Sequence, residues 1–227
     1  MMYLAILAGT IVFGGLVLTG LLASNMAPGR KRLEMETARM KADMDKWAGD
    51  LVPIDQKELE LFSLGQDKQV IRKGIATTAK GIFTTIYHEP VLAYSYREYL
   101  SNNKEKPNGL LYARTAEHEY IYWIQKGNAV LFIDGQEVGT LDAKGELRGK
   151  KTGKTIAQIT AKPSGLLPVV VGNKEVGNLT AQRPQKGKGL SERAFEYIAT
   201  EINDKEEQLF LALTLQEMVK RGIEVNK

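Results

Sequence analysis

The chain has 227 residues, which leaves enough for one domain with its own core after the first 27 are set aside. Its 31 basic and 27 acidic residues give a net charge of +4, an excess too small to indicate nucleic-acid binding by itself. The absence of cysteine excludes disulfides, thiolate metal sites, cysteine nucleophiles and lipid attachment at a cysteine.

The first predicted element is a transmembrane helix over residues 4–23, within an anchor segment 1–27. These 20 residues carry no charge, and a helix of this length is about as long as a bilayer is thick. A cleaved signal peptide fits less well, because no Lys or Arg precedes the apolar run. Arg30, Lys31 and Arg32 follow the run, so the positive-inside rule places the rest of the chain in the cytoplasm.

Residues 28–52 are predicted to form a juxtamembrane helical stalk. Six of its positions, five of them apolar and one a threonine, are spaced by 4, 3, 4, 3 and 4 residues, the spacing of a coiled-coil seam. They are Leu33, Thr37, Met40, Met44, Trp47 and Leu51. Two arrangements stay open: an amphipathic helix lying on the domain or the bilayer surface, and a dimer stalk.

Residues 53–227 are predicted to form one soluble, β-rich domain. Asp55 and Glu58 indicate a capping box, followed by a short helix that ends near Gly65. Strands are predicted at 81–88, 91–96, 110–116, 119–125, 129–133, 137–142, 155–161, 167–171 and 175–181. Lys126-Gly127-Asn128 and Asp134-Gly135-Gln136 have the composition of hairpin turns.

Two segments of this domain repeat one another. Residues 131–141 read LFIDGQEVGTL and residues 169–179 read VVVGNKEVGNL, each an apolar strand, a tight turn and a returning strand. Gly139 and Gly177 fall at the same place in the repeat, where a bulge or a close crossing would need no side chain. A hairpin used twice indicates a meandering antiparallel sheet rather than β-α-β units.

The last predicted element is an apolar helix, with Asp204 and Glu207 as its cap and Gly222 as its end. Residues 209–213 read LFLAL, so the helix is apolar around most of its circumference and is expected to be buried on several sides. A helix inside a wrapped sheet satisfies this pattern. The alternative is a helix packed on one face of a sandwich or used to dock a partner.

These features resemble the tubby-like superfamily, which includes tubby C-terminal domains, phospholipid scramblases and plant LURP-one-related proteins. The resemblance rests on the hairpins ending Glu137-Val-Gly139 and Glu175-Val-Gly177, and on the strand-like residues 195–202 followed by Asp204 and the helix over 209–215. It implies an antiparallel β-barrel wrapped around a C-terminal hydrophobic helix. It also implies a binding barrel rather than an enzyme.

The chain departs from the scramblases in ways that limit what the resemblance carries over. Their calcium motifs, cysteine acylation sites and proline-rich tails are absent, and the better membrane anchor here is N-terminal. Scrambling activity is therefore not expected.

Three basic clusters are the candidate lipid contacts. Arg30, Lys31 and Arg32 are expected at the membrane surface, where each basic residue contributes about 1 kcal/mol near an anionic leaflet. The other two clusters are expected to hold a phospholipid headgroup if they lie at one end of the barrel; solvated loop charge is the alternative. They are Arg148, Lys150, Lys151 and Lys154, and Arg183, Lys186 and Lys188.

The sequence nominates no catalytic or cofactor site. Residues 149–155, GKKTGKT, resemble a phosphate-binding loop but lead into a strand and have the wrong glycine spacing, so a basic hairpin turn is predicted. His88 and His118 lie far apart with no third ligand, so no metal site is predicted. No acid–base constellation is evident, and an enzyme with an unrecognised site is the weakest alternative.

The expected function is that of a non-catalytic, single-pass membrane-anchored module that binds phospholipid headgroups or a membrane partner. The alternative is a structural subunit of a membrane assembly that oligomerises through the anchor and the stalk. No cofactor and no nucleic-acid partner is expected.

Overall fold

The computed structural model describes residues 25–47, 49, 51–56, 58–103, 105–181 and 192–224. The predicted anchor, residues 4–23, lies outside these residues. No helix in the described part of the chain combines the length and the apolar character needed to cross a bilayer.

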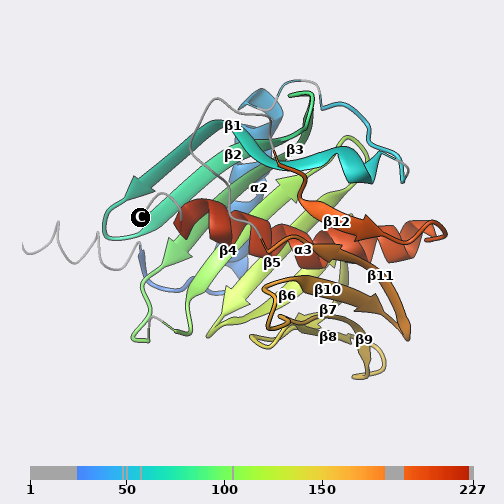
Figure 1. Cartoon of the computed structure of the whole chain (residues 1–227). Helices are drawn as coiled ribbons and strands as arrows, with labels where there is room; N and C mark the ends of the chain where they lie inside the picture. The colour runs from blue at the N-terminus through green and yellow to red at the C-terminus, as the bar shows by residue number, and fades with distance from the viewer. Residues whose placement is uncertain are drawn as a thin grey trace, which may run out of the picture.

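The described chain forms one mainly β domain with a single antiparallel sheet of twelve strands, paired in the order of the sequence (Figure 1). The strands are β1 (Phe62–Lys73), β2 (Thr77–Thr85), β3 (Pro90–Tyr99), β4 (Asn108–Arg114), β5 (Glu119–Gln125) and β6 (Asn128–Ile133). They continue as β7 (Gln136–Leu141), β8 (Glu146–Gly149), β9 (Thr155–Ile159), β10 (Leu167–Val171), β11 (Lys174–Leu179) and β12 (Phe195–Ile198).

The two edges of this sheet meet and nearly close it into a barrel. The backbone N–H of Leu64 donates to the carbonyl of Glu192 at 3.0 Å, and the N–H of Ala194 donates to the carbonyl of Phe62 at 2.8 Å. These bonds join the start of β1 to the residues just before β12. The predicted antiparallel barrel is therefore confirmed.

Helix α3 (Asp204–Glu224) lies inside the curve of the sheet, where Figure 1 shows it in red. Phe210 is 0% exposed and Leu213 is 1% exposed. One hydrophobic cluster joins α3 to buried residues of every strand from β1 to β12. A helix surrounded in this way is enclosed by the barrel and does not lie on one face of a sandwich.

Hydrogen bonds hold the backbone of α3 from two different strands of the sheet. The hydroxyl of Tyr122 in β5 donates to the carbonyl of Ala212 at 2.6 Å. The side-chain amide of Gln69 in β1 donates to the carbonyl of Gly222 at 3.4 Å. These contacts fix both the rotation and the depth of the helix within the barrel.

The ends of α3 differ from the predicted ones. The cap is Asn203, whose Oδ1 accepts from the N–H of Glu206 at 3.0 Å while Glu206 Oε2 accepts from the N–H of Asn203 at 2.9 Å. This reciprocal pair is a capping box one residue earlier than predicted. Gly222 does not end the helix, which continues to residue 224. A side chain at position 222 would instead meet Gln66 of β1, so the glycine allows the helix to approach this strand.

All nine predicted strands are present, and β5 and β10 have the predicted bounds. The predicted helix after Asp55 is only a 3-10 turn, η1 (Leu59–Leu61), although Glu58 does form the capping contact with Asp55 at 3.0 Å. Strand β1 was not predicted, because its first three residues are all buried and bulges interrupt its alternation. Strand β8, with only four residues, was also missed.

The repeated hairpins share one irregularity. In β6–β7 the register shifts between the pairs Leu131–Gly139 and Phe132–Glu137, and in β10–β11 it shifts between Val169–Gly177 and Val170–Glu175. The shift in each case marks a β-bulge beside the glycine, as the repeat predicts. The two glycines keep the crossing strands close.

Helix α2 (Arg30–Trp47) packs on the outer face of the barrel. Leu33, Met40 and Met44, three positions of the predicted seam, are 3%, 8% and 0% exposed. They pack against residues of β2 to β4, including Ile82, Ala93, Tyr99, Leu110 and Tyr112. Helix α2 therefore lies on the domain, and the barrel covers three of the seam positions that a dimer stalk would use.

Ion pairs flank α2 on both sides. Glu36 accepts from Arg97 at 3.2 Å on one side, and Lys41 donates to Glu119 at 2.5 Å on the other. The Lys41–Glu119 pair lies near the surface, where such pairs contribute about 0–1 kcal/mol, whereas the Arg97–Glu36 pair is partly buried.

We predict that Gly177→Ala destabilises the domain by about 1–3 kcal/mol, the usual cost of overpacking a core. A Cβ at Gly177 would lie 2.8 Å from the Phe210 ring and 2.8 Å from the carbonyl of Tyr197. Urea unfolding of the full chain in nanodiscs measures the change, and Phe210→Leu in the same chain should restore part of it. Gly74→Ala is the control, because its Cβ would approach no atom closer than 3.9 Å. Equal stabilities of the two alanine variants would contradict the prediction.

Candidate functional site

The connections at one end of the barrel are basic. Because the sheet is an antiparallel meander, every second connection lies at the same end, where α3 terminates. Each such connection between β1 and β10 carries an exposed lysine in its turn or next to it. They are Lys73, Lys106, Lys126, Lys144 and Lys162. These lysines define what we call the basic end.

Backbone contacts hold the connections of the basic end together. The N–H of Gly127, in the β5–β6 turn, donates to the carbonyl of Pro107 in the β3–β4 connection at 2.9 Å. Lys126 itself has a φ of 51°, in the left-handed region that a two-residue hairpin turn requires. The β7–β8 turn contacts β9, where the N–H of Ile159 donates to the carbonyl of Gly145 at 2.9 Å. The lysines therefore project from a rigid rim.

The N-terminal part of the chain joins the barrel at this same end. Asn25 accepts from the N–H of Leu100 at 2.7 Å, and Met26 forms a parallel bridge with Leu100. Leu100 follows β3 directly. The chain therefore enters the described domain beside the β3–β4 connection.

Arg30, Lys31 and Arg32 form the first turn of α2, close to this entry point. Arg30 pairs with Glu34 at 3.2 Å on an exposed surface. The macrodipole makes a helix N-terminus unfavourable for cations by about 0.3–1 kcal/mol each. Three adjacent cations in this position therefore do not stabilise the helix through its dipole.

The opposite end of the barrel is mainly acidic. It holds the β4–β5 and β6–β7 turns and the first turn of α3. Its carboxylates include Glu117, Asp134, Asp204, Glu206 and Glu207. Carboxylates from three separate elements therefore gather at this end of the barrel.

The predicted cluster of Arg148, Lys150, Lys151 and Lys154 lies at this acidic end, on β8 and in the β8–β9 turn. Arg148 pairs with Glu146 at 3.1 Å, and Lys150 pairs with Glu137 at 2.7 Å. The turn is closed by the N–H of Gly149, which donates to the carbonyl of Lys154 at 2.9 Å, so residues 149–155 form the predicted basic hairpin.

The structure thus places this second cluster and the Arg30, Lys31 and Arg32 cluster at opposite ends. The third predicted cluster, Arg183, Lys186 and Lys188, lies outside the described residues. That the second and third clusters bind lipid stays a prediction.

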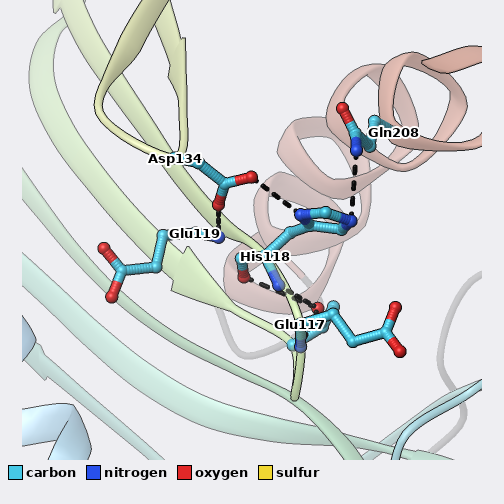
Figure 2. Close-up of polar contacts among 6 residues, drawn as sticks. Glu117, His118, Glu119, Asp134 and Gln208 are labelled. Atoms are coloured by element: carbon cyan, nitrogen blue, oxygen red, sulfur yellow. Dashed lines mark hydrogen bonds and ion pairs between the residues drawn. The ribbon is translucent and has the colours of Figure 1, made fainter. Parts of the chain in front are cut away.

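His118 is the most elaborate polar site at the acidic end, and Figure 2 shows its contacts. Its Nδ1 lies 2.8 Å from Asp134 Oδ2, and its Nε2 lies 3.1 Å from Gln208 Nε2. Asp134 Oδ1 also accepts from the N–H of Glu119 at 2.8 Å. Both ring nitrogens are therefore engaged, and the site fastens two turns of the barrel to the start of α3.

This arrangement fits a structural latch better than a catalytic dyad. The hydroxyl of Thr115, in the same turn, accepts from the backbone N–H of His118 at 3.0 Å and of Glu117 at 3.3 Å, so it closes the turn. The other histidine, His88, is exposed in the β2–β3 turn. Among the described residues, no group of three His, Asp or Glu side chains could hold a metal ion.

Glu207 lies on α3 next to Gln208. Burial raises the pKa of its carboxyl, and the charges of Glu117 and Asp204 raise this pKa further, while His118 lowers it. A carboxyl with a higher pKa in the folded state binds its proton more tightly when folded. Its ionisation at neutral pH therefore costs stability, and this cost disappears as pH falls through the folded-state pKa.

The comparisons with known proteins identify no relative of this chain. No family model matches the sequence, and neither a curated protein nor a solved structure matches this chain.

We predict that Glu207→Gln raises the melting temperature of the full chain at neutral pH. The gain should vanish below about pH 4, where ordinary glutamates are protonated in any case. Thermal unfolding followed by circular dichroism across this pH range measures the difference. Glu175→Gln, on the exposed surface of β11, is the control and should give no comparable gain. A Glu207→Gln gain that persisted at acid pH would contradict the assigned cause.

Proposed function

We propose that this protein is a non-catalytic, single-pass membrane-anchored binding module of the tubby-like type, and that its basic end contacts anionic phospholipid headgroups of the cytoplasmic leaflet. The observation that supports this most is the gathering of lysines from separate connections at the end where the chain enters the barrel. A last strand, a capped apolar helix and an enclosing meander support the family resemblance.

The length of the chain between anchor and barrel strengthens the argument. If residues 4–23 span the bilayer, only Ser24 separates them from Asn25, which is hydrogen-bonded to the end of β3 through Leu100. One residue spans less than about 4 Å. The basic end is then held at the membrane surface, and the acidic end points away from the anionic leaflet.

The energetics favour this orientation. A lysine or arginine close to an anionic leaflet contributes about 1 kcal/mol, and the attraction falls off within a Debye length of about 8 Å at physiological salt. Lys106, Lys126, Lys144 and Lys162 form no ion pair with any residue that the structure describes, so their charges are free to act on lipid. The anchor already supplies a high local concentration, so modest contacts suffice to orient the domain.

The alternative of a structural subunit that oligomerises through the stalk has lost its main support. The barrel covers Leu33, Met40 and Met44, which a coiled coil would need. An assembly made through the anchor remains compatible with lipid contact by the basic end.

The orientation can be measured with single fluorophores, because the chain has no cysteine of its own. Ala143→Cys places a label in the β7–β8 turn of the basic end, and Asn173→Cys places one in the β10–β11 turn of the other end. The full chain is reconstituted in nanodiscs that contain a quencher on the lipid headgroups. We expect strong quenching at residue 143 and little at residue 173 when phosphatidylserine is present, with the difference shrinking at high salt.

Matched charge variants identify the residues responsible. Neutralising Lys126, Lys144 and Lys162 to Gln should reduce quenching of the label at residue 143 to its level in phosphatidylcholine. Neutralising Lys150, Lys151 and Lys154 removes the same charge from the acidic end and should leave the quenching unchanged. Loss of quenching only in the second variant would instead support the β8–β9 cluster and overturn the proposed orientation.

A further inference from the structure

A cavity of about 460 Å³ opens inside the barrel at the basic end, between the C-terminal half of α3 and the inner face of the sheet. Its size falls within the range of small-molecule sites, about 300–1,000 Å³. The deep wall is apolar. It includes Leu111, Ile124, Leu141, Ile159, Leu213 and Ile223.

The polar residues of the cavity are mainly carboxylates, although the surrounding turns carry lysines. Glu98, Glu105, Asp142 and Glu217 line it, and the one basic residue among its lining residues is Lys220. The Glu217 charge is already balanced, because Arg221 Nε donates to it at 3.0 Å. The cavity therefore presents a negative field inside a positive rim.

Two side chains that line this cavity carry oxygen atoms that could accept a hydrogen bond from a ligand. Gln216 Oε1 is fully buried and has no hydrogen-bond partner among the described residues. Glu98 forms no ion pair with any described residue, and Tyr96 lies two positions from it on the same face of β3. Burial, and then the charge of Glu98, raise the pKa of Tyr96, so its phenol ring remains neutral next to the carboxylate.

We propose that the cavity binds a primary amine that carries an apolar tail. An ammonium group has three N–H donors and no acceptor, which matches the Glu98 carboxylate and Gln216 Oε1. The face of the Tyr96 ring suits a cation, and the aliphatic wall accommodates the tail. This binding goes beyond the contact with anionic lipid and does not depend on it.

The same chemistry occurs in free alkylamines and in the ethanolamine headgroup of a phospholipid next to its acyl chains. The full chain with labelled Leu and Ile methyl groups is placed in phosphatidylcholine nanodiscs and titrated with hexylamine. Hexanol and hexanoate have the same tail without the ammonium. We expect shifts of the Leu111, Ile124 and Ile159 methyls, with hexylamine binding about tenfold more tightly than hexanol because a charged hydrogen bond is added.

Two variants of the cavity should act in opposite directions. Glu98→Gln removes the carboxylate and should weaken hexylamine binding about tenfold, with little effect on hexanol. Lys220→Gln removes the cation and should strengthen hexylamine binding. Opposite effects in one cavity cannot come from a general loss of folding.

A second set of nanodiscs replaces part of the phosphatidylcholine by phosphatidylethanolamine, with no free amine added. The same methyl shifts would support the site with a lipid headgroup as its ligand, and shifts with hexylamine alone would support it with a free amine. Equal affinities for hexylamine and hexanol, an unaltered affinity in Glu98→Gln, or no shifts with either amine source would overturn the proposal. None of these arms contains anionic lipid, so they are independent of the test of membrane orientation.

Discussion

The fold depends on one constraint: an apolar helix has to be removed from water on all sides at once. Each fully buried Leu or Phe of α3 contributes about 1.5–3 kcal/mol, far more than any exposed ion pair of this domain. A flat sheet would cover only one face of the helix, so the strands curve around it until β1 meets the residues before β12. Edge-on contact between Phe195 and Phe210, with ring centroids 4.8 Å apart, ties the closing strand to the helix.

The same constraint determines at which end of the barrel each charged connection lies. A meander around a central helix places alternate connections at alternate ends, and the helix fixes which end is which. The lysines of five connections and the entry of the chain at Asn25 then coincide at one end. Around the terminus of α3 the barrel leaves a cavity that is lined by carboxylates, whereas the surrounding turns carry lysines. Lipid contact and amine binding are both proposed from this single consequence of the fold.

The enclosed helix was predictable, because LFLAL over 209–213 leaves no polar side for water. The glycines of the repeated hairpin, Gly139 and Gly177, likewise predicted the two β-bulges. The basic end was not predictable, because it depends on strand β8, which has only four residues and was missed. Without β8, the turn at 150–154 falls at the same end as Lys126, whereas the added strand moves it to the other end. The seam of α2 could not be resolved by spacing alone, since Met40 and Met44 suit a partner helix and a sheet equally well.

Amide hydrogen exchange of the full chain in nanodiscs tests most directly whether the barrel encloses α3. Residues 209–219 should exchange only through global unfolding, as slowly as the central strands β4 and β5 and far more slowly than the outer helix α2. Exchange of these amides at the rate of α2, well before the central strands, would show that the helix lies open on the sheet and would contradict the account.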